Sequence, residues 1–449
     1  MIFHGNKQTM KTSLYLSLFA AMCLSPLASG QEEVITLFEK AQEGDAQAQY
    51  ELGSHYMKGE GVKKDAAKAE MWYRKAAEQG YAKAKEALEL LGDMGQPSEA
   101  SAVPPAQPAT PAAEEEYQKG LAYSEGKGVE KDKAKALEHY RAAAEQGHPA
   151  AQTVLGLSYE NGEGVEQNLQ EAVRWYKAAA EQGNAVAQNN LGVLYEIGKG
   201  VEQNMQEAVR WYKAAAEQGS SFAQKNLGVL YENGKGVEQN LQEAARLYRA
   251  AAEQGDAFAQ YSLGSLYIQG KGVAQNMQEA VRLYKASAEQ GHANAQYNLA
   301  VCYYQGMGVK KNMQETVRLY RAAAEQGFAG AQNNLGFHYE NGIGVKRNMQ
   351  EAVRLYKAAA EQEFAAAQCS LGACYMTGQG VRQNLKEGFR WMSKAAENGS
   401  VNAMINLGQY YETGTGVARS RQNAIKWYRK AVELGSDLAR ARLRRMGVQ

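Results

Sequence analysis

Residues 151–186 read AQTVLGLSYENGEGVEQNLQEAVRWYKAAAEQGNAV, and copies of this stretch fill most of the 449-residue chain. The glycine of its Leu-Gly pair, Gly156, marks one position in a period of 36 residues. The same position holds Gly120, Gly192, Gly228, Gly264, Gly336, Gly372 and Gly408, with Ala300 in one copy and Gly53 in an earlier, separated one. A fixed period of this length indicates an array of small helical units.

Each repeat is predicted to form two helices. Apolar residues recur at helical spacing over 151–159, which predicts the first helix. Gly162 and Gly164 then end it, because glycine tolerates the left-handed backbone of a helix C-terminus. Asn168 is a good N-cap for the second helix, and Glu171 is placed to complete a capping box.

The second helix ends at Gly183, and its body over 172–180 is rich in helix-forming residues. A single helix pair cannot bury its apolar face, whereas stacked pairs can. We therefore expect an all-α fold, an α-solenoid of antiparallel helix pairs with 36-residue repeats. Charges at helical spacing, such as Glu171 with Arg174 and Lys177 with Glu181, predict that the second helices form a solvated, convex surface.

Composition and motifs restrict the chemistry. The 50 Lys and Arg residues balance 49 Asp and Glu residues, which argues against a nucleic-acid partner. No catalytic motif is found, so we expect no enzyme activity, no catalytic residue and no cofactor. Cys302, His338 and Cys374 occupy one position in successive repeats, where a metal would need its ligands much closer than stacked helices allow. They are interpreted as packing residues, and no metal site is predicted.

The N-terminus has the pattern of an export signal over 1–30. Lys11 precedes an apolar stretch at 14–24, and small residues at 28–30 form a cleavage site before Gln31. Translation could start at Met1 or at Met10, which leaves this prediction unchanged. No other segment is long and apolar enough for a transmembrane helix. We expect an exported protein, either periplasmic or secreted.

The rest of the chain is predicted to form four parts. Residues 31–92 hold a single repeat with flanking helices, and 93–113 form a linker rich in Pro and Ala. Residues 114–436 form an array of nine repeats, and 437–449 form a basic capping helix. The capping helix contains Arg440, Arg442, Arg444 and Arg445, which either keep the last repeat soluble or provide an electrostatic dock for an acidic surface.

The repeat pattern resembles the Sel1-like repeat family, which is related to the tetratricopeptide repeats. The resemblance rests on Ala-x-x-x-Leu-Gly-x-x-Tyr-x-x-Gly-x-Gly-Val, followed by an Asn-capped helix that ends in Ala-Ala-x-x-Gly, in ten copies. It implies a right-handed superhelix and an adaptor or scaffold role in bacterial export, envelope or signalling complexes. One branch of the family, proposed to bind or hydrolyse β-lactams, has a cysteine pair in each repeat, which this chain lacks.

The first helices provide the candidate binding site, a concave groove whose variable positions differ between repeats. Two residues before the repeat glycine lie Asn190, Asn226, Asn298, Asn334 and Asn406. Such amides could bind an extended peptide backbone, or could simply cap helices or contact solvent. Four residues after the glycine, Glu160, Glu196 and Glu232 form an acidic row, continued by Glu340 and Glu412. Tyr261, Ile268, Tyr297 and Tyr304 interrupt these patterns and are interpreted as binding anchors in preference to core residues.

These patterns favour one function over two others. We expect a non-enzymatic, exported adaptor or scaffold that binds a protein or peptide segment in the groove and assembles or regulates a bacterial envelope complex. The alternative is a β-lactam-binding or cell-wall-active enzyme, which the missing cysteine pairs disfavour. A purely structural spacer is the third possibility. The partner and the oligomeric state stay open at this point.

Overall fold

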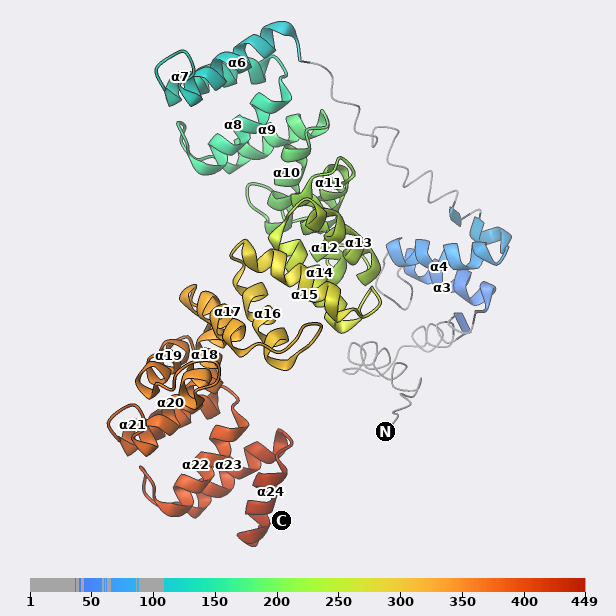
Figure 1. Ribbon diagram of the computed structural model, residues 1–449. Helices are drawn as coiled ribbons and strands as arrows, with labels where there is room; N and C mark the ends of the chain where they lie inside the picture. Colours follow the sequence, from blue (N-terminus) through green and yellow to red (C-terminus); the bar gives the residue numbers. More distant parts are fainter. Residues whose placement is uncertain are drawn as a thin grey trace. The chain divides into compact units, whose positions relative to one another are not determined.

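The computed structural model describes residues 109–448 without a gap and residues 44–88 except 59, 61, 63–65 and 86, together with residues 37, 40 and 41. The regular secondary structure of these residues is entirely helical (Figure 1). The chain divides between residues 102 and 103 into two compact units. The predicted export signal and most of the predicted linker lie outside the described residues.

The described helices form ten pairs, as the 36-residue period predicts. The first helices of the pairs are α3 (Ala46–Lys58), α6 (Pro111–Glu125), α8 (Pro149–Asn161), α10 (Ala185–Ile197), α12 (Ser221–Asn233), α14 (Ala257–Gln269), α16 (Ala293–Gln305), α18 (Ala329–Asn341), α20 (Ala365–Thr377) and α22 (Val401–Thr413). The second helices are α4 (Ala66–Glu78), α7 (Lys133–Glu145), α9 (Leu169–Glu181), α11 (Met205–Glu217), α13 (Leu241–Glu253), α15 (Met277–Glu289), α17 (Met313–Glu325), α19 (Met349–Glu361), α21 (Leu385–Glu397) and α23 (Arg421–Glu433). A last helix, α24 (Asp437–Arg445), follows the final pair.

The helix ends form where glycine and asparagine predict them. Gly162 ends α8 in the left-handed region, with φ of 73°, and its N–H donates to the Ser158 carbonyl. The Asn168 side chain accepts the Glu171 N–H at 3.1 Å and caps α9. In a complete capping box the Glu171 side chain would also accept the Asn168 N–H, but both groups have other partners here. The Asn168 N–H donates to the Tyr159 carbonyl at 2.9 Å, and the Glu171 carboxylate pairs with Arg174.

The repeat glycine allows the two helices of a pair to approach closely. A Cβ atom on Gly156 would lie 2.5 Å from Cδ1 and Cε1 of Tyr176, so the Tyr176 ring leaves no room for a side chain at Gly156. Tyr176 and Leu155 are fully buried in this contact. Equivalent glycine–tyrosine contacts recur in other repeats, for example between Gly192 and Tyr212.

A relay of glutamines connects the repeats. The Gln182 side chain donates to the Gln152 side chain within one repeat at 2.7 Å. In the next repeat Gln188 donates to the Ala180 carbonyl at 3.0 Å. The bond between glutamines recurs at Gln218 and Gln254, and the bond to the preceding helix recurs at Gln224 and Gln260. Consecutive helices therefore pack against one another in chain order, which confirms the predicted α-solenoid of helix pairs.

The first unit contains one repeat with its own core. Leu52 and Ala48 of α3 pack with Trp72 and Tyr73 of α4. Residues 82–85 and 87–88 after this pair are helical, where the sequence predicts a flanking helix. In the second unit, Pro111 is the first residue of α6 although the sequence placed it in the linker. Proline is favoured at the first position of a helix, where its missing N–H is not needed.

Candidate partner-binding faces

The acidic row on the first helices is tied to the buried tyrosines of the second helices. The Tyr176 hydroxyl donates to Glu160 at 2.7 Å, and Tyr212 makes the same bond to Glu196. Burial and the adjacent carboxylate raise the pKa of Tyr176 above its usual value, so the hydroxyl remains a donor. The remaining pairs of this kind are Glu232 with Tyr248, Glu340 with Tyr356 and Glu412 with Tyr428. Each of these carboxylates therefore holds a buried tyrosine and is also half-exposed to solvent.

The predicted asparagine row bridges successive repeats. Asn226 donates to the side chain of Asn189 one repeat earlier at 3.1 Å. Asn334 donates to the hydroxyls of Tyr297 and Tyr320 at 3.3 and 3.2 Å. Of the other members, Asn190 accepts from Asn189, Asn298 donates to the Tyr284 hydroxyl, and Asn406 donates to the Met392 sulfur. All five asparagines are half-buried, so part of their hydrogen-bonding capacity is used within the protein.

The predicted aromatic anchors lie half-buried between the surface and the core. Tyr261, Ile268 and Tyr297 pack against the core cluster formed around Leu299. The Tyr304 ring meets His338 edge-on at 5.5 Å. These residues are also continuous with exposed rings, because Tyr261 contacts Phe258 at 6.4 Å between ring centroids.

A row of exposed apolar side chains begins one turn before these tyrosines. Val186, Phe222 and Phe258 stand at the second position of α10, α12 and α14, each 36 residues from the next. They are 56%, 62% and 38% exposed, although other helices have small or polar residues at this position. This row was not predicted, although the 36-residue spacing of Val186, Phe222 and Phe258 in the sequence was a signal for it. We call the surface formed by Val186, Phe222, Phe258, Tyr261 and Tyr297 the apolar face.

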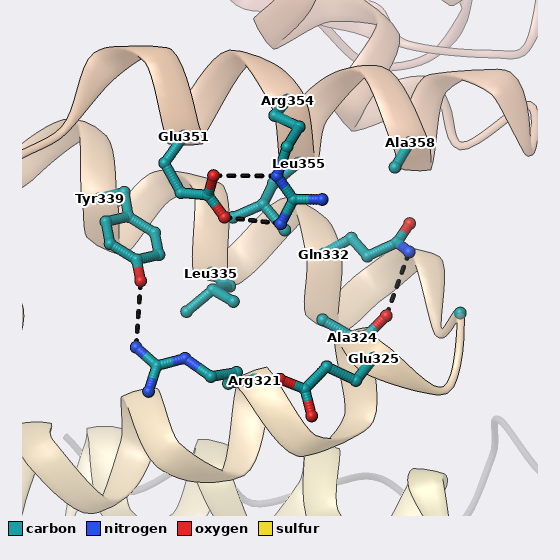
Figure 2. Close-up of a pocket in the computed structure, with 11 residues that line it drawn as sticks. Arg321, Ala324, Glu325, Gln332, Leu335, Tyr339, Glu351, Arg354, Leu355 and Ala358 are labelled. Carbon is teal, nitrogen blue, oxygen red and sulfur yellow. Dashed lines mark hydrogen bonds and ion pairs between the residues drawn. The ribbon is translucent and has the colours of Figure 1, made fainter.

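A separate pocket of about 490 Å³ lies between α17 and α19, over α18 (Figure 2). Leu335, Leu355, Ala324 and Ala358 supply its apolar surface. Arg321 donates to the Tyr339 hydroxyl at 3.0 Å on one side. On the opposite side Arg354 binds Glu351 through two bonds of 2.9 and 2.6 Å. Sequence reasoning treated the second helices as a solvated surface and missed this pocket.

The basic helix α24 closes the array. Ala439 and Leu443 are buried against the last pair, whereas Arg444 and Arg445 are exposed. Arg440 pairs with Asp437 at 2.6 Å. The half-exposed Arg442 completes the predicted basic set. This arrangement is compatible with both predicted roles, a solubilising cap and an electrostatic dock.

Cys302, Cys374 and His338 are packing residues in this structure. Cys302 and Cys374 are buried free thiols, and burial raises the pKa of each to about 11. His338 is buried and lies 2.7 Å from the Ile343 carbonyl through Nδ1. In the part of the chain that the structure describes, no three metal-ligating side chains come together. No described helix has the length and apolar character needed to cross a membrane.

The comparisons with known proteins identify the repeat. The family model described as Sel1 repeat matches residues 46–81, 116–148, 149–184, 185–220, 221–256, 257–292, 293–328, 329–364, 365–400 and 401–436. The chain belongs to the Sel1 repeat family. The resemblance inferred from the sequence is thereby confirmed, and the chain is a repeat solenoid of a kind that typically serves as a protein-interaction scaffold.

Solved Sel1 repeat structures resemble the chain over long stretches. The crystal structure of c5321, described as a protective antigen present in uropathogenic Escherichia coli strains, is 36% identical with a TM-score of 0.68. That match covers 93% of this chain and 84% of the other. A Sel1 repeat protein from Oxalobacter formigenes is 35% identical with a TM-score of 0.50, and the match covers 54% of this chain and 96% of that one. No curated protein matches the chain.

Proposed function

We propose that this Sel1 repeat protein is an exported, non-enzymatic adaptor that holds a segment of a protein partner against its first helices. The predicted export signal and the likeness to an antigen of a pathogenic bacterium support a role outside the cytoplasm. By binding one protein segment while its other surfaces stay free, the array would assemble or regulate an envelope complex.

The apolar face is the observation that carries this proposal. Phe222 is 62% exposed and Phe258 is 38% exposed, in successive repeats. Clustered exposed apolar side chains mark interaction sites in proteins, and aromatic residues are frequent anchors of binding energy. Asn226 lies one turn after Phe222 on α12 and provides an amide for a peptide backbone beside this anchor. Glu196 and Glu232 lie about 15 Å further along α10 and α12 and provide carboxylate acceptors at the other ends of these helices.

The experiment compares the proteins that co-purify with the wild-type chain from an envelope extract with those captured by a Phe222→Ala, Phe258→Ala variant. We expect capture of the specific partner to fall at least about tenfold, since each ring contributes roughly 1.5–3 kcal/mol when buried. Leu385→Ala is the matched control, because Leu385 is 40% exposed but begins a second helix. Equal capture by all three proteins would refute the apolar face as the binding site.

A second variant tests the anchors predicted from the sequence. Tyr261 and Tyr297 pack against the core, so their loss would lower stability as well as binding. Tyr304→Ala gives a milder change, because Tyr304 is not among the side chains packed against that core cluster. The helical content and melting temperature of this variant are measured beside partner capture. Reduced capture with unchanged melting supports Tyr304 as an anchor, whereas unchanged capture removes it from the site.

Export is tested independently of binding. The N-terminal residue of the protein isolated from fractionated cells should be Gln31 or a close neighbour if the signal is cleaved. Recovery of the intact N-terminus in the cytoplasmic fraction would contradict export and leave the binding experiment unaffected.

A further inference from the structure

The second-helix pocket differs between repeats at one position. Leu355 lies in the pocket between α17 and α19, 36 residues before Trp391. Trp175 and Trp211 occupy the same position in earlier repeats and are 8% and 3% exposed. From α9 onward the second helices therefore have either leucine or tryptophan at this position, whereas α7 has His139.

Where this position holds tryptophan, the guanidinium of the preceding arginine stacks on the indole ring. The guanidinium carbon of Arg174 lies 4.6 Å from the Trp175 ring centroid, and Arg210 lies 4.7 Å from Trp211. Arg390 lies 5.5 Å from Trp391 while its Nη2 still donates to Glu387. An arginine here can therefore bind its carboxylate and cover an aromatic ring at the same time.

Two larger side chains distinguish the pocket one repeat later, where Trp391 replaces Leu355 and Lys394 replaces Ala358. The pocket beside Trp391 is about 350 Å³, against about 490 Å³ beside Leu355. Leu335, Tyr339, Glu351 and Arg354 line the larger pocket. Their counterparts one repeat later, Leu371, Tyr375, Glu387 and Arg390, do not line the smaller one. The space next to Arg354 thus corresponds to the place of an aromatic ring in other repeats.

The pocket also has an arginine without an anionic partner. Arg321 donates to the neutral Tyr339 hydroxyl, and no carboxylate of the gap-free range 109–448 lies within ion-pair distance of it. Figure 2 shows Arg321 across the pocket from the Glu351–Arg354 pair, with Leu335 between them. The pocket lining also contains the carboxylate of Glu325, one turn after Arg321 on α17, and Arg321 contributes to the lowered pKa of Glu351. Arg354 pairs with Glu351, so Arg321 is the arginine of this pocket whose guanidinium makes no ion pair.

We propose that the Leu355 pocket, formed by Arg321, Leu335, Tyr339, Arg354 and Leu355, binds an acidic aromatic segment of a partner protein. The aromatic ring packs on Leu355 and Leu335 beneath the Arg354 guanidinium, and an adjacent Asp or Glu carboxylate pairs with Arg321. This site lies between the second helices α17 and α19, over the first helix α18, and shares no residue with the apolar face.

The same residues recur once more in the array. Arg249 donates to the Tyr267 hydroxyl at 3.1 Å, and Leu283 follows Arg282 as Leu355 follows Arg354. At Leu247 and Leu319 the corresponding cation is a lysine, Lys213 or Lys285. The proposal therefore predicts two sites, at Leu283 and Leu355, and distinguishes them from two leucine positions that lack the arginine.

The experiment uses the full chain and the peptide acetyl-Asp-(4-fluoro-Phe)-Asp amide, observed by fluorine NMR line broadening. Phenylalanine is chosen because the indole nitrogens of Trp175 and Trp211 have no hydrogen-bond acceptor at this position. Leu283→Trp with Leu355→Trp should weaken binding about tenfold by filling both pockets with the chain's own rings. Leu247→Trp with Leu319→Trp is the matched control and should leave the broadening unchanged. Equal effects of the two double variants, or no broadening with the wild-type chain, would overturn the proposal.

A second pair of variants tests the charge without changing the packing. Arg249→Gln with Arg321→Gln should abolish the preference for the Asp peptide over acetyl-Lys-(4-fluoro-Phe)-Lys amide, a difference of roughly two- to fivefold for a partly exposed ion pair. Circular dichroism checks that each variant is folded. Should the tryptophan variants unfold, this preference decides the question alone: its loss supports the pocket, and its persistence refutes it.

Discussion

The contact between the repeat glycine and the tyrosine ring is the tightest side-chain constraint within a helix pair. Replacing Gly156 by Ala would place a Cβ atom 2.5 Å from the Tyr176 ring. We expect a loss of about 1–3 kcal/mol in the free energy of unfolding from overpacking, larger than the roughly 1 kcal/mol that alanine usually adds to a helix. Urea unfolding of the variant measures this loss.

The pair formed by α16 and α17 provides the control for that prediction. Ala300 occupies the glycine position there and is fully buried. Ala300→Gly should lose only the helix-propensity contribution of about 1 kcal/mol or less. If Gly156→Ala proved more stable than the wild-type chain, the inferred constraint would be wrong.

His338 should make stability depend on pH. Burial is the largest effect on it and lowers the pKa of His338, which is also flanked by the rings of Tyr304 and Tyr320. The unfolded chain, with a histidine pKa of about 6.5, then binds a proton more readily than the folded one, so acidification favours unfolding. Between about pH 7 and pH 5 the free energy of unfolding should fall less steeply in His338→Leu. Identical slopes in urea titrations of the two proteins would contradict this.

At the residue scale, positions whose role is local could be predicted from the sequence. Asn168 caps its helix because an N-cap depends only on the following turn. The role of Glu160 could not be predicted, because its partner Tyr176 is 16 residues away on another helix. Similarly, the pocket at Leu355 depends on residues from three helices, although the alternation of Leu and Trp in the repeat alignment was a signal for it.

At the scale of single helices, two first helices lack the cap that the others have. Phe328 and Phe364 stand at the N-cap positions of α18 and α20 and make no side-chain cap bond, whereas Ser400 caps α22. Phe364 is 36% exposed, so Phe364→Ser should add about 1 kcal/mol of stability without a large loss of packing. Hydrogen exchange of the α20 amides measures the gain.

Ser400→Ala is the reciprocal control for this element. It should lose a similar amount, because it removes the bond to the Ala403 N–H. Phe328 is less suitable, since its ring contacts Tyr297 at 5.1 Å. Unchanged exchange in α20 of the Phe364→Ser variant would show that the phenylalanine packing compensates for the missing cap.

For the second unit as a whole, the last helix protects the end of the array. Ala439 and Leu443 of α24 are buried against the final pair, and terminal caps of repeat proteins maintain solubility. Deletion of residues 437–449 should speed hydrogen exchange in α22 and α23 and leave α8 and α9 unchanged. Arg444→Ala with Arg445→Ala keeps the buried residues and should not change exchange. Equal protection of α22 in the deleted chain would contradict a capping role.

The fold of this unit was predictable because its information is repeated. Each copy of the Leu-Gly and Tyr pattern reports the same helix pair, so the substitution of Ala300 in one copy did not obscure the period. Individual features, such as the exposed Phe222 and the Arg321 that donates to Tyr339, occur in one or a few copies. Their roles depend on neighbours in space, which the period does not report.

The glutamine relay has a consequence for how such a gene changes. Because Gln182 and Gln188 make the same bonds at one junction as their counterparts make at the next, the repeats over 149–364 can follow one another, whereas the last repeat has Met404 in place of the first-helix glutamine. Unequal recombination between copies would therefore insert or excise whole units while each new junction keeps its hydrogen bonds. Array length can thus evolve in steps of one repeat, and distinctive surfaces such as that around Phe222 can be duplicated or lost as units.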